Sequence, residues 1–119
     1  MEEVSILYAI IEYRKPIKHL EGAHNITVKR LGTFKLLIDA EKALYSAGKN
    51  GSAPNIGYRL DDTKYNVQRE FYNPTNKMIY VKQPDERNEF GKRAFHSYTL
   101  SQYRNWITQK AKNPFTQVI

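Results

Sequence analysis

The sequence has no cysteine among its 119 residues. Disulfide scaffolds, thiol nucleophiles, CxxC redox sites and cysteine-ligated zinc ribbons are therefore excluded. A long hydrophobic run is also lacking, because the apolar stretch from Val4 to Ile11 is too short to cross a bilayer. Glu2 and Glu3 precede that stretch and no small-residue cleavage site follows it, so it does not resemble a signal peptide. We expect an intracellular, cytoplasmic protein with no membrane partner.

Motifs for catalysis, metal binding or cofactor binding are missing as well. His19 and His24 are five residues apart and His96 is distant, so the sequence has no HxH or HxxxH pair for a metal. Residues 48–52 have the composition of a phosphate-binding loop but not its GxxxxGK[ST] order. The sequence therefore predicts no catalytic residue, no metal site and no cofactor.

Apolar residues are nevertheless frequent enough to build a core. Hydrophobic residues make up 40% of the chain and aromatic residues 13%, although the mean hydropathy is only −0.69. This content of large apolar side chains argues against a disordered chain. The length falls within the usual range for one compact domain, so we expect residues 1–119 to form a single domain.

The first half of the chain predicts two strands and a helix. Val4–Tyr13 is expected to be a central strand covered on both sides, because alternate positions are apolar on both of its faces. Ile26–Lys29 is predicted as a short second strand. A helix is predicted from Gly32 to about Ala47, and Gly48 is expected to end it in the left-handed conformation. Alternatively, the extended pattern continues further and the helix begins at Asp39.

The second half predicts a further strand, a hairpin and a last strand. Asp61 and Asp62 are expected to end the first of these strands. Asn73–Asn76 suits a type I turn at the centre of the hairpin, since proline is at its second position. The predicted strands are, in order, Ile56–Leu60, Lys64–Tyr72, Lys77–Lys82 and Ala94–Tyr98.

A second helix has the clearest start signal in the chain. Thr99 and Gln102 have the spacing of a capping box, in which each side chain accepts a hydrogen bond from the other residue's backbone N–H. Trp106 and Ile107 are expected to anchor this helix to the sheet. The order of elements predicts the α+β class, a mostly antiparallel β-sheet with two packed α-helices.

The positive charge is concentrated in the second half of the chain. The net charge is +7, and residues 1–63 carry nine Lys or Arg against eight Asp or Glu. Residues 64–119 carry ten basic residues against four acidic ones, a net of +6. Such an asymmetry favours a basic face that attracts a polyanion.

Basic residues also alternate with aromatic ones through residues 58–112. Nucleic-acid surfaces use this mixture, because cations neutralise phosphates while aromatic rings stack on bases. We therefore expect a small binding module for DNA or RNA. Its predicted contact residues are Arg59, Lys64, Arg69, Lys77, Lys82, Lys92, Arg93, Arg104 and Lys112.

Two other functions stay open. The basic face suits a protein-interaction or inhibitor module, of the kind found in phages or mobile elements, that docks an acidic protein partner. The third possibility is a small nuclease or nicking enzyme. A nuclease would need acids and a lysine to converge at a sheet edge, and Asp61, Glu70 and Lys82 are the candidates. Against this, Asp61 begins a common turn dipeptide and Glu70 can pair with Lys77 across the hairpin.

Overall fold

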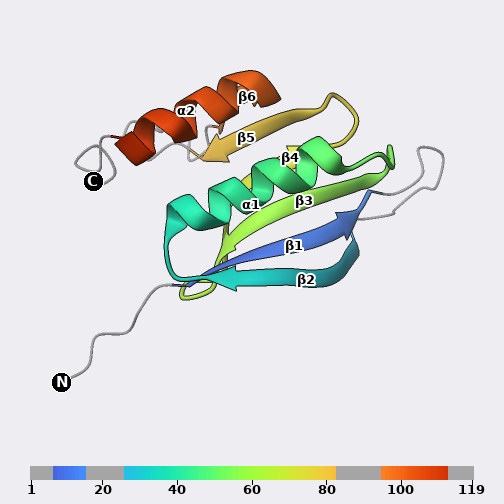
Figure 1. Cartoon of the computed structure of the whole chain (residues 1–119). Coiled ribbons are helices and arrows are strands. Elements are labelled where there is room, and N and C mark those ends of the chain that lie inside the picture. The colour runs from blue at the N-terminus through green and yellow to red at the C-terminus, as the bar shows by residue number, and fades with distance from the viewer. Residues whose placement is uncertain (1–6, 16–25, 83–94, 113–119) are drawn as a thin grey trace, which may run out of the picture.

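Six strands and two helices make up the described part of the chain, which in this computed structural model comprises residues 7–15, 26–82 and 95–112. The strands form one sheet in the order β2-β1-β3-β4-β5-β6, and each neighbouring pair is antiparallel. This arrangement confirms the predicted α+β class (Figure 1). The elements are β1 (Tyr8–Arg14), β2 (Ile26–Phe34), α1 (Leu37–Asn50), β3 (Ile56–Asp62), β4 (Val67–Asn73), β5 (Met78–Lys82), β6 (Phe95–Thr99) and α2 (Leu100–Lys112).

Both helices pack side by side on the same face of the sheet (Figure 1). Helix α1 lies over β1, β2 and β3, while α2 lies over β5 and β6. The apolar core fills the space between the helices and this face, and its side chains are almost fully inaccessible to solvent. Its largest apolar members are Tyr103, Ile10, Leu44, Leu60 and Ile79. No described helix covers the opposite face, which is called the open face below.

Strand β1 is buried on both of its faces, as predicted. Ile10 faces the helices, whereas its neighbours Ala9 and Ile11 point to the open face and are also buried. Tyr13 lies on the open face too, and its hydroxyl donates a hydrogen bond of 2.9 Å to the carbonyl oxygen of Tyr72. Its ring therefore crosses β3 and closes that part of the open face.

The predicted start and end of the first helix are wrong. Strand β2 continues to Phe34, so the helix begins at Leu37, nearer the alternative start than the favoured one. Gly48 lies inside α1 and does not terminate it. A Cβ atom there would lie 2.8 Å from the Tyr72 ring, so this glycine allows the helix to approach β4 closely.

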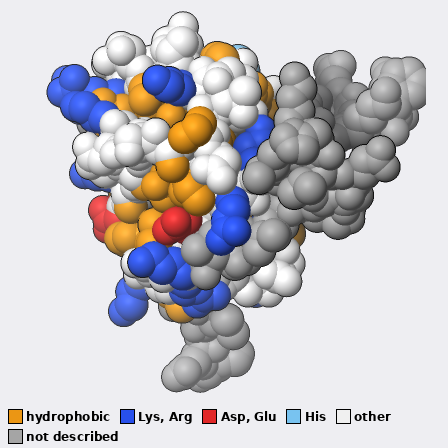
Figure 2. Space-filling model, turned by 90° about the vertical axis from the view of Figure 1, so that its right-hand side faces the viewer, with side chains coloured by type: hydrophobic (Ala, Val, Ile, Leu, Met, Phe, Trp, Pro, Cys, Tyr) orange, Lys and Arg blue, Asp and Glu red, His pale blue; other side chains and the backbone are white. Residues whose placement is uncertain are grey.

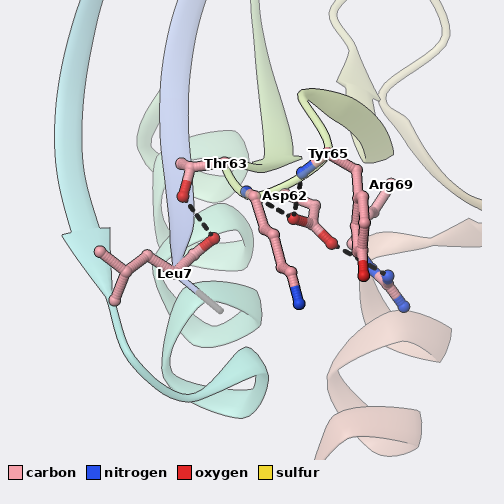
Figure 3. A network of polar contacts seen from close by, with 6 residues as sticks. Leu7, Asp62, Thr63, Tyr65 and Arg69 are labelled. Atoms are coloured by element: carbon pink, nitrogen blue, oxygen red, sulfur yellow. Dashed lines mark hydrogen bonds and ion pairs between the residues drawn. The ribbon is translucent and has the colours of Figure 1, made fainter. Parts of the chain in front are cut away.

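Strand β3 continues two residues beyond the predicted Leu60, so Asp61 and Asp62 belong to it and Asp62 is its last residue. The Asp62 carboxylate accepts hydrogen bonds from the backbone N–H groups of Lys64 and Tyr65, at 2.8 and 3.2 Å (Figure 3). These bonds fold the chain into a turn, closed by Asn66 in the left-handed region with a φ of 57°. The following strand consequently starts at Val67, three residues later than predicted.

The β4–β5 hairpin is confirmed, but its turn is longer than the predicted type I turn. The backbone N–H of Lys77 donates to the carbonyl oxygen of Asn73 at 2.8 Å, which encloses one residue more than a type I turn does. Lys77 has a φ of 61°, and the Asn73 side chain accepts the backbone N–H of Thr75 at 2.9 Å. The sequence missed the extra residue because a non-glycine residue in the left-handed region has no strong sequence signal.

The capping box of the second helix is confirmed. The backbone N–H of Thr99 donates to Gln102 Oε1 at 2.9 Å, and the backbone N–H of Gln102 donates to Thr99 Oγ1 at 3.1 Å. Helix α2 is anchored by the buried Tyr103 and Ile107. Trp106, which was expected to share this role, is only half-buried and stacks on Tyr98, with ring centroids 5.2 Å apart.

Candidate nucleic-acid interface

One row of side chains crosses the open face from strand to strand. The register pairs Arg59 of β3 with Phe71 of β4, and Phe71 with Tyr80 of β5. Neighbouring strands lie about 4.8 Å apart, so these side chains are adjacent on the surface. A guanidinium group thus begins a row that continues as two aromatic rings.

The aromatic rings of this row contact one another. Phe71 and Tyr80 stack with ring centroids 4.9 Å apart and an angle of 11° between their planes. Phe95 of β6 meets Phe71 edge-on at 5.5 Å. All three side chains are half-buried, so part of each ring stays open to solvent. We call Arg59, Phe71, Tyr80 and Phe95 the aromatic row.

An ion pair holds the cation at the start of the aromatic row. Arg59 Nε lies 3.1 and 3.0 Å from the two carboxylate oxygens of Asp61, which is on the same face of β3. Burial raises the pKa of the Asp61 carboxyl, while the Arg59 charge opposes that shift. Because Asp61 engages Nε, the two terminal guanidinium nitrogens of Arg59 remain available to an anion.

A hollow of about 130 Å³ opens beside the aromatic row. Arg59 and Phe71 contribute to its wall, and Gln68 and Asn73 add amide groups. The hollow is lined by Tyr13, Lys15, Arg59, Gln68, Phe71 and Asn73. Strands β1, β3 and β4 therefore all contribute to it.

Two of these lining residues are held in place by the β4–β5 turn and by burial. Lys15 Nζ donates to Asn73 Oδ1 and to Thr75 Oγ1, both at 3.2 Å. Burial raises the pKa of Tyr13 to about 12, so its hydroxyl keeps its proton and its hydrogen bond at neutral pH. The hollow is thus lined by a neutral hydroxyl from Tyr13 and by two cations, Lys15 and Arg59.

A β-bulge brings Gln68 to this face. Simple alternation predicts Gln68 on the side of Glu70, but the register pairs Leu60 with Glu70 and Asp61 with Gln68. Arg69 is skipped, so Gln68 changes face. Sequence reasoning missed Gln68 for this reason, and it missed Lys15 because it considered only residues 58–112. A lysine directly after the first strand was the available signal for Lys15.

The structure divides the predicted basic residues among separate surfaces. Arg59 and Lys82 lie on the open face, where Lys82 pairs in register with Phe95. Lys64 and Arg69 lie at one end of the sheet and Lys77 lies at the opposite end. Exposed residues Arg104 and Lys112 are on α2, in the helical layer. Lys92 and Arg93 lie outside the described residues.

Lys64 and Arg69 flank an exposed tyrosine at the β3–β4 turn (Figure 3). Tyr65 is 63% exposed, and Lys64 Nζ lies 5.0 Å from its ring centroid. Arg69 Nη1 is 3.8 Å from Asp62 Oδ2, and its guanidinium also lies over the Tyr8 ring at 5.9 Å. This cluster is cationic and aromatic like the aromatic row, but it is a separate surface at the end of the sheet.

The opposite end of the sheet carries Lys77 in the β4–β5 turn. Figure 2 looks onto this end of the molecule, where Lys and Arg side chains cover more of the described surface than Asp and Glu do. A cleft of about 510 Å³ lies there between the α1–β3 connection and the turn. Lys77 is the one charged residue among the described residues that line it, and Ser52 and Thr75 add hydroxyl groups.

The three residues of the possible nuclease centre do not converge. Asp61 points to the open face and pairs with Arg59, whereas Glu70 points to the helices and is buried. The sheet therefore separates the two carboxylates. Within the described ranges, no group of three His, Asp or Glu side chains is arranged to hold a metal ion.

Glu70 does not pair with Lys77, contrary to one sequence interpretation, because it faces the helices. It accepts a hydrogen bond of 2.5 Å from the Tyr103 hydroxyl and lies next to the fully buried Glu41 of α1. Lys110 Nζ of α2 donates to Glu41 Oε1 at 2.6 Å. Burial first, and then hydrogen bonding and charge repulsion with Glu41, raise the pKa of Glu70 well above its ordinary value.

Neither the hollow beside Phe71 nor the cleft at Lys77 is lined by a member of this buried carboxyl cluster. Its side chains join α1, α2 and β4, so it holds the helices on the sheet. The sequence contained a signal for it, since Glu41 falls within the apolar stripe of the first predicted helix.

No family model, curated protein or solved structure matches this chain. The geometry of the chain itself is therefore the basis for any functional conclusion. In the part of the chain that the structure describes, neither helix combines the length and apolar character needed to cross a bilayer.

Proposed function

We propose that this protein binds nucleic acid through the open face of its sheet. The observation that carries the proposal is the aromatic row, in which the Arg59 guanidinium is followed by the stacked rings of Phe71 and Tyr80. Half-exposed rings on a sheet surface are suited to stacking on bases, and adjacent cations are suited to phosphates.

Charge supports this choice of ligand. The second half of the chain has a net charge of +6, which is distributed over β4, β5, α2, the turns and the residues outside the described ranges, and Lys82 places part of it on the open face. On the open face, Asp61 is already paired with Arg59 and so repels a phosphate less than a free carboxylate would. Lys15 and Lys82 add cations on either side of the aromatic row. A polyanion with stackable groups complements both properties of this surface.

The proposal is tested by fluorescence anisotropy with labelled oligonucleotides across a salt series. We compare the wild type with Lys82→Gln on the open face and with Arg104→Gln in the helical layer, two substitutions that each remove one exposed or half-exposed cation. Lys82→Gln should weaken binding and reduce the salt slope by about one charge. Arg104→Gln should leave both unchanged.

Two other outcomes overturn the proposal. If Arg104→Gln weakens binding and Lys82→Gln does not, the contact surface is the basic side of α2, as the sequence prediction for Arg104 and Lys112 requires. If no oligonucleotide binds at low salt, the module that docks an acidic protein becomes the better hypothesis, because the same charges would serve that partner.

A further inference from the structure

We infer that the open face is built for single-stranded nucleic acid, and that the hollow beside Phe71 receives one unpaired base. This inference rests on the proposed function and adds the class of ligand. It is carried by the position of the hollow beside Phe71, by the polar groups that line it and by the orientation of the helices.

The hollow is small, with a volume of about 130 Å³, and it is open to solvent on the open face. Arg59 and Phe71 both line it, so a planar ring that enters it from the open face meets the Phe71 side chain. The wall contributed by Phe71 supplies the surface on which that ring would stack.

The polar groups of the hollow match the edge of a base and a phosphate. The Gln68 side chain carries both a donor and an acceptor, so it can bond to the edge of any of the four bases. Arg59 and Lys15 line the same hollow and supply positive charge for a phosphate. This combination predicts stacking with weak base preference.

A duplex would use different structural features. Sequence readers of double-stranded DNA insert a helix or a two-stranded ribbon into the major groove. Here both described helices pack on the sheet face opposite the aromatic row, so none projects from it. The rings of the aromatic row could only meet bases that are not already stacked in a duplex.

The test compares labelled twelve-nucleotide strands of thymidine, of uridine and of mixed sequence, each alone and annealed to its complement, at one salt concentration. The single strands should bind at least tenfold more tightly than the duplexes. Phe71→Leu should lower single-strand affinity by about tenfold, as expected for losing one stacked base, and should leave the weak duplex binding unchanged.

Tyr65→Leu is the matched control, because it also replaces an aromatic ring by leucine but lies at the end of the sheet. It should bind single strands as the wild type does. Thermal melting of each variant checks folding, since Phe71 also packs against Tyr80 and Phe95. Gln68→Ala, at a half-exposed position without packing of this kind, should lower single-strand affinity as well and serves if Phe71→Leu does not fold.

The possible failures are distinguishable. Equal binding of single strands and duplexes, with Phe71→Leu and Gln68→Ala both silent, overturns the base-binding hollow but leaves nucleic-acid binding intact. An absence of binding to every oligonucleotide at low salt overturns the proposed function together with this inference. A loss in Tyr65→Leu that matches the loss in Phe71→Leu moves the stacking site to the end of the sheet and overturns the assignment of the hollow.

Discussion

The two faces of the sheet handle charge in opposite ways. On the helix-covered face, Glu41 and Glu70 are buried together and share their environment with Tyr103 and Lys110. On the open face, Asp61 is paired with a half-exposed arginine. The same strands thus carry a buried network on one side and a partly hydrated ion pair on the other.

The difference shows where charge serves stability and where it is available for binding. A carboxylate removed from water costs several kcal/mol unless a proton or a partner neutralises it, so the buried pair is bound into the fold. An ion pair that stays near water costs little and contributes little, which leaves Arg59 free to meet another anion. The open face is therefore the better candidate for a binding surface.

The largest expected effect comes from Tyr103, which is fully buried and donates to Glu70. Tyr103→Ala removes a large core side chain and leaves a buried carboxyl without its donor, and should lower the free energy of unfolding by about 3–5 kcal/mol. Tyr103→Phe keeps the ring and should lower it by about 1–3 kcal/mol. Urea unfolding measures both, and a Tyr103→Phe variant as stable as the wild type would contradict a structural role for the hydroxyl bond.

On the open face, Gly57 allows the Tyr13 ring to lie flat across β3. A Cβ atom at this position would overlap the Tyr13 ring, so Gly57→Ala must displace a residue whose hydroxyl bonds to β4. We expect a loss of about 1–3 kcal/mol, the usual cost of overpacking. Urea unfolding is again the measurement. A variant as stable as the wild type would mean that the Tyr13 ring can move without cost.

Glu70 should make stability fall as the pH rises. Its folded pKa is raised well above the ordinary 4.5, so above that pH the folded protein keeps a proton that the unfolded chain has released. The folded state then binds more protons, and the free energy of unfolding declines by up to about 1.4 kcal/mol per pH unit until folded Glu70 ionises. Glu41, Tyr103 and Lys110 face Glu70 and influence its folded pKa, so they set the pH at which the decline in stability ends.

Glu70→Gln should remove most of this decline, because glutamine does not ionise. Urea unfolding at a series of pH values above 4.5 gives the two slopes. An unchanged slope in Glu70→Gln would show that another group holds the proton. The pKa of Asp61 is also raised by burial, so Asp61 too makes stability fall as the pH rises. Asp61→Asn should therefore remove a smaller share of the decline than Glu70→Gln does.

The smallest effect is expected from the ion pair of the open face. Asp61→Asn at neutral pH should change the free energy of unfolding by about 1 kcal/mol, because Asp61 is buried but its partner Arg59 keeps contact with water. If Asp61→Asn lowered the free energy of unfolding as much as Tyr103→Ala does, charge on the open face would be as important for stability as charge on the helix-covered face, and the contrast would be wrong. The same variant should bind oligonucleotides more tightly than the wild type, since it frees Arg59 and removes a negative charge.

Local patterns determined several features of this protein without any tertiary structure. The capping box at Thr99 and Gln102, the β4–β5 hairpin and the α+β class all follow from residues close together in the chain, whose interactions are set by backbone geometry. The interleaving of basic and aromatic residues led only to a prediction that Arg59 is a contact residue, and that stays a prediction.

Only the tertiary structure decided which of these side chains lie together. Alternation along a strand states that Glu70 and Phe71 point in opposite directions, but not which direction faces the helices. The bulge at Arg69 moves Gln68 to the other face, and α1 brings Glu41 to Glu70 from a distant part of the chain. Burial, register and the pairing of charges depend on contacts between segments far apart in sequence, and no local pattern encodes them.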